Sequence, residues 1–195
     1  MKTQTKIVAI VAVFFAISCG GSREVTRVDP NTQIDLSGRW NDTDSKLVAE
    51  EMIGDVLSKP WITRFETKTD KRPVVIIGDV VNRTHEHISA ETFIKDIERE
   101  FINSGRVRVV ENAAFRDKLR EELASQQVNA SEETRKKLAR ELGADFIMFG
   151  VINSTVDELG KEKVVAYKTN LELVDLQSTE KVWIGDKEIK KYIKN

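Results

Sequence analysis

The stretch that most limits how this chain can fold is a long apolar run, residues 74–81, which begins directly after Pro73. Its valines and isoleucines favour a strand, and it has too few polar residues to turn one face to water. Proline is tolerated at the first position of a strand. We therefore expect a central strand of a sheet at this position.

A helix and a second strand follow this run. Ser89 is a typical N-cap residue, and Ile88 before it can pack against Phe93 at the fourth helical position. Gly105 supplies the left-handed conformation that ends many helices, and residues 107–110 then form a short strand. The apolar residues expected to face the core are Phe93, Ile94, Ile97, Phe101 and Ile102. The order strand, helix, strand indicates a β-α-β unit.

Three more helices are predicted from apolar spacing and capping residues. The first begins among the N-cap groups of residues 41–44 and ends before Pro60. The other two cover residues 115–123 and the segment that Ser131 caps. The apolar positions of the first helix are Leu47, Val48, Met52, Val56 and Leu57.

The last third of the chain follows the two-residue period of strands. Residues 144–152 predict another buried strand, and residues 182–184 predict the hairpin partner of a long strand, with the turn at residues 177–179. One face of that long strand carries Val165, Tyr167, Thr169, Leu171 and Leu173. The predicted fold class is α/β: a mixed β-sheet sandwiched by about four helices, with a C-terminal antiparallel hairpin.

Residues 1–18 have the organisation of an export signal. Lys2 and Lys6 precede the apolar run of residues 7–17, which is about half of the roughly 20 residues that cross a bilayer as a helix. Cys19, the single cysteine, follows a small residue and resembles the lipobox at which bacteria attach a diacylglyceryl group. We expect cleavage before Cys19 and a lipid on its thiol; the alternative is an ordinary signal peptide that ends beside a cysteine.

Three segments follow from these patterns: a signal peptide at residues 1–18, a flexible tether at residues 19–36 and a single domain at residues 37–195. A flexible tether of this length reaches about 20–25 Å, and at most roughly 60 Å when stretched. The lipid on Cys19 would replace a membrane span, because each buried methylene contributes about 0.8 kcal/mol. Gly20 stands where lipoproteins retained in the inner membrane commonly have Asp, which favours the outer membrane.

Few groups in the sequence suit catalysis. His85 and His87, with Glu86 or Asp79 nearby, are the best candidates for a metal site, but they fall in a predicted loop, where a structural role is favoured. The common nucleotide-binding, hydrolase and metalloprotease motifs are absent. The formal net charge of −1 gives no nucleic-acid footprint. We expect no enzymatic activity, no metal and no cofactor other than the covalent lipid.

Five segments, taken in order, are characteristic of one family: residues 36–42, 73–78, 82–88, 104–107 and 142–150. Together with the lipobox at Cys19, they resemble the LpoB-type penicillin-binding protein activators. This resemblance implies a monomeric outer-membrane lipoprotein with a fold like the N-terminal domain of TolB. It also implies that the protein binds and stimulates a bifunctional class A penicillin-binding protein, a peptidoglycan synthase, and so regulates cell wall synthesis.

Such an activator has no active site and acts by binding the active conformation of its partner more tightly than the inactive one. The residues taken as possible partner-binding positions are Arg39, Trp40, Asn82, Arg83 and His87. A core position for Trp40, and a loop-fixing role for Asn82 and Thr84, are the alternatives. The tether, with Pro30 as its one proline, is shorter than the proline-rich spacer of enteric members.

Two other functions compete with this one. Residues 144–150 also carry the Ala-Asp-x-x-x-x-Gly strand of the CsgG and TolB-like group, which predicts a structural role in an envelope secretion complex. Pore-forming members of that group need two extra membrane-crossing strands of about 9–11 residues, and the sequence has no spare segment for them. A small wall-active enzyme is the third hypothesis, based on export and on adjacent acidic residues in the predicted helices.

Overall fold

The computed structural model describes residues 24–29, 32–110 and 143–194. The chain forms two units, Met1–Thr32 and Gln33–Asn195, and the second includes residues 33–36, which the sequence assigned to the tether. The predicted signal peptide, Cys19, and the helices predicted at residues 115–123 and after Ser131 lie outside the described residues. Within the described ranges, no helix is long and apolar enough to span a membrane.

The described part of the second unit contains helices and strands in the order of an α/β fold. They are α2 (Asp42–Ser58), α3 (Trp61–Thr69), β1 (Val74–Asn82), α4 (Ala90–Ser104), β2 (Arg108–Val109), β3 (Phe146–Leu159), β4 (Glu162–Asp175) and β5 (Lys181–Lys194).

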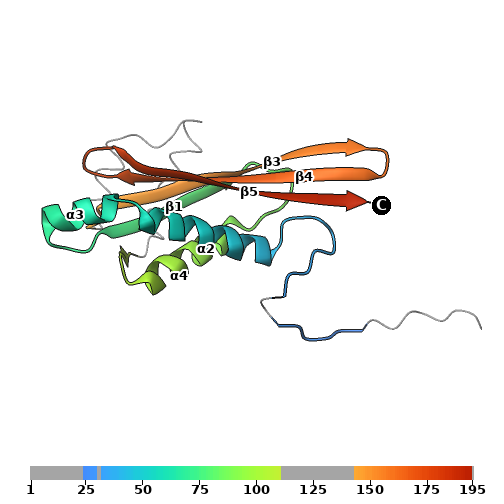
Figure 1. The fold of residues 1–195 in the computed structure, drawn as a ribbon, viewed down its shortest axis with the longest axis horizontal. Helices are drawn as coiled ribbons and strands as arrows, with labels where there is room; N and C mark the ends of the chain where they lie inside the picture. Colours follow the sequence, from blue (N-terminus) through green and yellow to red (C-terminus); the bar gives the residue numbers. More distant parts are fainter. Residues whose placement is uncertain (1–23, 30–31, 111–142, 195) are drawn as a thin grey trace, which may run out of the picture. The chain divides into compact units, whose positions relative to one another are not determined.

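The strands form one mixed sheet in the order β2-β1-β3-β4-β5. β1 pairs in parallel with β2 and with β3, while β3–β4 and β4–β5 are antiparallel. Helices α2 and α4 lie side by side below the sheet, and the long strands β3, β4 and β5 extend past them (Figure 1). The mixed sheet, the β-α-β unit from β1 to β2 and the C-terminal hairpin of β4 and β5 confirm the predicted fold class.

The helix ends lie where the capping residues predicted them. Asn41 is the N-cap of α2 and forms a capping box with Asp44, in which each side chain accepts from the backbone N–H of the other. Ser89 caps α4 by accepting from Thr92. Gly105, with φ of +63°, ends α4 in the left-handed conformation that favours glycine.

Two of the predicted inward positions were wrong, and one short helix was not predicted. Ile102 and Leu47 are 58% and 45% exposed, because each lies at the edge of its helix's apolar stripe, beside residues that already fill the core. The first helix, α2, ends at Ser58, before Pro60, as predicted. Pro60 is then the N-cap of α3, a helix the sequence did not predict. Proline is tolerated at a helix start, where its missing N–H would have no intrahelical partner.

The main core lies between the sheet and the three described helices. On β4, the alternation was predicted correctly: Val165, Tyr167, Thr169, Leu171 and Leu173 are all buried. Trp61 and Phe65 of α3 pack edge-to-face on Phe146 of β3, with ring centroids 4.8 and 5.3 Å apart. A smaller cluster on the opposite face of the sheet contains Ile76, Ile147, Val174 and Leu176.

Thr169 is a polar residue buried in this core. Its hydroxyl is fully buried and forms no hydrogen bond with any residue in the described part of the chain. A buried hydroxyl without a partner costs about 1–3 kcal/mol relative to water. Thr169→Val keeps the side-chain shape and should raise the free energy of unfolding by about 1 kcal/mol, as measured by urea denaturation. Thr155→Val, on the exposed part of β3, is the control and should change it by less than about 0.5 kcal/mol. A loss of stability in Thr169→Val would contradict this explanation.

Candidate functional site

The loop after β1, residues 82–88, is held in one conformation by its own side chains. Asn82 accepts from the N–H and hydroxyl of Thr84 at 2.9 and 2.8 Å and donates to the carbonyl of Glu86 at 2.8 Å. The Thr84 hydroxyl also accepts from the Glu86 N–H at 3.1 Å. These bonds replace the backbone pairing that the chain loses where β1 ends. Asn82 and Thr84 therefore fix the loop, as the structural alternative predicted.

Glu86 joins this loop to the segment that precedes α2. We call residues 33–41 the strap. One carboxylate oxygen of Glu86 accepts from the Trp40 N–H at 3.2 Å, and the other accepts from the Tyr167 hydroxyl at 2.8 Å. Tyr167 is fully buried on β4. Burial, and then the hydrogen bond to the Glu86 carboxylate, raise the pKa of Tyr167 well above its ordinary value, so the hydroxyl stays protonated and donates.

Trp40 anchors the strap to the core. Its ring meets Tyr167 and Phe93 edge-to-face, with centroids 5.5 and 6.4 Å apart, and its Nε1 donates to the Ser45 hydroxyl at 2.8 Å. These contacts occupy both the ring and its polar atom, which explains why Trp40 is only partly exposed. The structure thus places Trp40 at the edge of the core.

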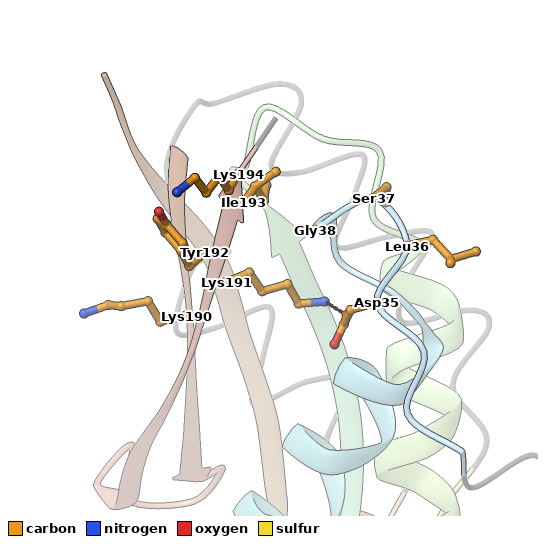
Figure 2. A pocket seen from close by; sticks show the side chains of 9 residues that line it. All are labelled: Asp35, Leu36, Ser37, Gly38, Lys190, Lys191, Tyr192, Ile193 and Lys194. Atoms are coloured by element: carbon orange, nitrogen blue, oxygen red, sulfur yellow. Dashed lines mark hydrogen bonds and ion pairs between the residues drawn. The ribbon is translucent and has the colours of Figure 1, made fainter. Parts of the chain in front are cut away.

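A buried lysine fixes the strap from the other side. Lys191 of β5 is 8% exposed, and its ammonium donates to Asp35 and Asp44 at 2.6 Å each and to the Arg39 carbonyl at 2.9 Å. Figure 2 shows Lys191 reaching from β5 to Asp35 on the strap. Burial alone would lower the pKa of Lys191, but the hydrogen bonds to both aspartates outweigh it and raise the pKa. The hydrogen bond from Lys191 also lowers the pKa of Asp35.

The predicted partner-binding residues divide into two groups. Trp40 and Asn82 are partly buried and hold backbone in place, whereas Arg39, Arg83 and His87 are exposed. Arg39 and Arg83 each adjoin a residue that forms a hydrogen bond with Glu86: Trp40 follows Arg39, and Asn82 precedes Arg83. The structure therefore brings the strap and the 82–88 loop together on one side of the domain.

His85 contacts one residue of β3 and one of its own loop, and His87 is exposed. His85 Nδ1 lies 3.1 Å from the Ser154 hydroxyl, and its Nε2 lies 3.9 Å from the Glu86 carboxylate. Across residues 24–29, 32–110 and 143–194, no three His, Cys, Asp or Glu side chains are grouped so that they could hold a metal ion.

Sequence reasoning missed Lys191 and Tyr167, and it named Glu86 only as a possible metal ligand. One signal was available for Lys191: it shares the two-residue period of Trp183, an inward residue of β5. A charged residue at such a position needs a buried partner. The partner itself is not visible in the sequence.

Known proteins resemble this chain in sequence pattern and in fold. The family model of the peptidoglycan-synthase activator LpoB matches residues 44–189. The LpoB C-terminal domain from Salmonella enterica is 16% identical with a TM-score of 0.54, and the match covers 75% of this chain and 98% of that one. The LpoB C-terminal domain from Escherichia coli is 17% identical, with the same TM-score of 0.54 and the same coverage of 75% and 98%. No curated protein matches the chain in sequence.

The two structural likenesses show a shared fold, and the family match spans most of the chain, from within α2 to within β5. The chain belongs to the family of the peptidoglycan-synthase activator LpoB.

Proposed function

We propose that this protein is an envelope lipoprotein that binds a bifunctional class A penicillin-binding protein and stimulates its peptidoglycan synthesis, without being an enzyme itself. The observation that carries the proposal is the match to the LpoB family over residues 44–189. The C-terminal domains of two LpoB proteins, which share this fold, support it. Binding must favour an active state of the synthase over an inactive one, because a ligand with equal affinity for both states shifts nothing.

The surface formed by the strap and the 82–88 loop suits such a contact. Arg39, Arg83 and His87 project from backbone that the Glu86 and Asn82 hydrogen bonds already fix. Fixed backbone lowers the entropy that binding must overcome. The side chains of Arg39 and Arg83 have no ion-pair partner within the described ranges, so this surface fits acidic groups on the synthase. Charges of this kind determine the association rate and the choice of partner.

Reversing the two exposed arginine charges tests this surface. Arg39→Glu with Arg83→Glu should weaken binding to the synthase about tenfold, or about 1.4 kcal/mol, and lower the stimulated rate at limiting activator concentration. Binding is measured by surface plasmon resonance and synthesis by glycan polymerisation, with full-length protein in detergent. Arg64→Glu is the matched control, because Arg64 is an exposed arginine on α3, at the opposite end of β1 from the loop. Wild-type protein that neither binds nor stimulates any class A synthase would refute the function, whereas equal effects of Arg64→Glu would refute only the surface.

The proposed anchor is a lipid on Cys19 that holds the protein at the outer membrane, facing the periplasm. Two or three acyl chains on one residue suffice for stable anchoring. A Cys19→Ala variant should lose labelling by a radioactive fatty acid and move from the membrane fraction to the soluble periplasmic fraction. Cys19→Ser, which keeps the size of the side chain, should behave in the same way. Unchanged membrane association of both variants would contradict the anchor, and sucrose-gradient separation of the two membranes tests its location.

A further inference from the structure

A hollow of about 420 Å³ lies between the strap and the end of β5 (Figure 2). On one side it is lined by Asp35, Leu36, Ser37 and Gly38 of the strap, and on the other by five consecutive residues, Lys190 to Lys194. Neighbouring residues of a strand point to opposite faces of the sheet. A hollow lined by five in a row therefore runs along the edge of the strand and not over one face.

The backbone of β5 offers unpaired hydrogen-bonding groups at this edge. Just after β4, the Leu176 N–H donates to the Asp145 carbonyl, which lies just before β3, and this bond fixes the phase of the β3–β4 ladder. The even-numbered residues of β4 therefore point their backbone N–H and C=O groups toward β3. Tyr192 is paired with Val164, an even-numbered residue, and so directs its own N–H and C=O away from β4. Lys190 and Lys194 share that orientation. No described residue pairs with these outward groups.

The side chains on this edge define what could pair with it. Lys190, Tyr192 and Lys194 occupy alternate positions and therefore one face, and Tyr192 is 61% exposed. The two lysines lie 3.4 and 3.7 Å from Glu188 and Glu162 in ion pairs whose members are all about half exposed or more. Such pairs contribute little, so both ammonium groups are available to other carboxylates.

The opposite wall is held at a fixed distance. Lys191 bonds to Asp35, and Gly38 lies so close to the Ile193 side chain that a Cβ at this position would overlap it. These two contacts hold the strap beside the end of β5. Five strand residues at about 3.3 Å each span about 16 Å, which is the length of a short added strand.

We propose that this hollow binds an extended segment of a partner protein as an added strand on β5, and that the segment has the pattern acidic-x-apolar-x-acidic. Its backbone bonds to the outward groups of Lys190, Tyr192 and Lys194, its carboxylates lie opposite the two lysines, and its apolar residue lies opposite Tyr192. The pattern is symmetrical, so it fits a parallel and an antiparallel strand alike. The inference does not depend on the partner being a synthase.

Peptide binding to the full-length protein in detergent tests this site by fluorescence anisotropy. The probe is a labelled heptapeptide of sequence Thr-Glu-Thr-Leu-Thr-Glu-Thr, and its control replaces both Glu residues with Lys. We expect saturable binding of the acidic peptide that is at least tenfold tighter than that of the control. Lys190→Glu with Lys194→Glu should reverse this preference.

Proline substitutions separate strand addition from simple charge attraction. Tyr192→Pro removes an outward N–H without breaking the β4–β5 ladder and should weaken binding at least tenfold. Asp186→Pro is the matched control, because Asp186 pairs with Asn170 and also points outward, but lies outside the hollow. It should bind as the wild type does, and circular dichroism melts check that both variants fold.

Three results would overturn the proposal. If the wild type binds neither peptide, the lysines only guard the edge against unwanted pairing. If both proline variants bind equally, the contact is electrostatic and involves no added strand. If Tyr192→Pro abolishes a concentration-dependent self-association in sedimentation experiments, the occupant is a second copy of this chain.

Discussion

Lys191→Met should lower the free energy of unfolding by about 3–5 kcal/mol, because it removes one partner of a buried ion cluster and leaves the other charges behind. Asp44 is 2% exposed and accepts from Lys191 at 2.6 Å. Methionine nearly matches the length of lysine, so lost packing contributes little. The measurement is urea denaturation followed by circular dichroism at neutral pH.

Two further variants distinguish a buried charge from general sensitivity of β5. Lys194→Met removes a lysine from the same strand, but its ion pair with Glu162 is exposed at both ends, so stability should change by less than about 1 kcal/mol. Adding Asp44→Asn to Lys191→Met removes the uncompensated carboxylate and should restore part of the loss. Equal losses in Lys191→Met and Lys194→Met would show that the cluster has no special weight.

The same cluster determines how stability depends on pH. The pKa of Asp35 is lowered in the folded protein, so its contribution is present above the unfolded pKa near 3.8 and is lost as the pH falls through the folded value. The pKa of Lys191 is raised, so its contribution is present below about 10.5 and is lost as the pH rises through the folded value. The free energy of unfolding of Lys191→Met should therefore lie furthest below that of the wild type between about pH 3.8 and pH 10.5. At lower and at higher pH, the difference in free energy between the two proteins should become smaller.

Glu86→Ala should lower the free energy of unfolding by about 2–3 kcal/mol and reduce the stimulation of a partner synthase. The change leaves the Trp40 N–H without its acceptor and leaves the fully buried Tyr167 hydroxyl with a long hydrogen bond of 3.5 Å to the Gly38 carbonyl. Hydrogen bonds to a charged group are worth about 1.5–3 kcal/mol. The strap and the 82–88 loop then lose the bridge that positions Arg39 and Arg83. Urea denaturation and the glycan polymerisation assay measure the two effects.

A double-mutant cycle with Tyr167→Phe isolates the central bond of this bridge. Tyr167→Phe removes the hydroxyl that donates to Glu86 at 2.8 Å, so in its presence Glu86→Ala should cost about 1–2 kcal/mol less. Full additivity would show that the two groups are not coupled.

Because the pKa of Tyr167 is raised, wild-type stability should also fall as the pH rises above 10, where the unfolded chain loses the tyrosine proton more easily than the folded one.

Much of the fold was predictable because it depends on patterns within a single element. The apolar run of β1, the Ser89 cap and Gly105 stop of α4, and the two-residue period of β4 each determine local structure from neighbouring residues. The lengths of β3 and β5 were not predictable in this way. Both strands continue into exposed, largely polar sequence, where backbone pairing with β4 holds them and the side chains carry no burial signal.

For the candidate site, the sequence pointed to two segments that the structure brings together, but not to the contacts that connect them. It selected Trp40, Asn82 and the residues around them, whereas the acceptor Glu86, the donor Tyr167 and the lysine that holds the strap emerged only from the tertiary structure. Lys191 is 156 residues from Asp35 and 147 from Asp44 in the chain. A polar contact over such a separation leaves no periodic trace, because its energy depends on distance, direction and burial, which are set only when the strap, α2 and β5 pack together.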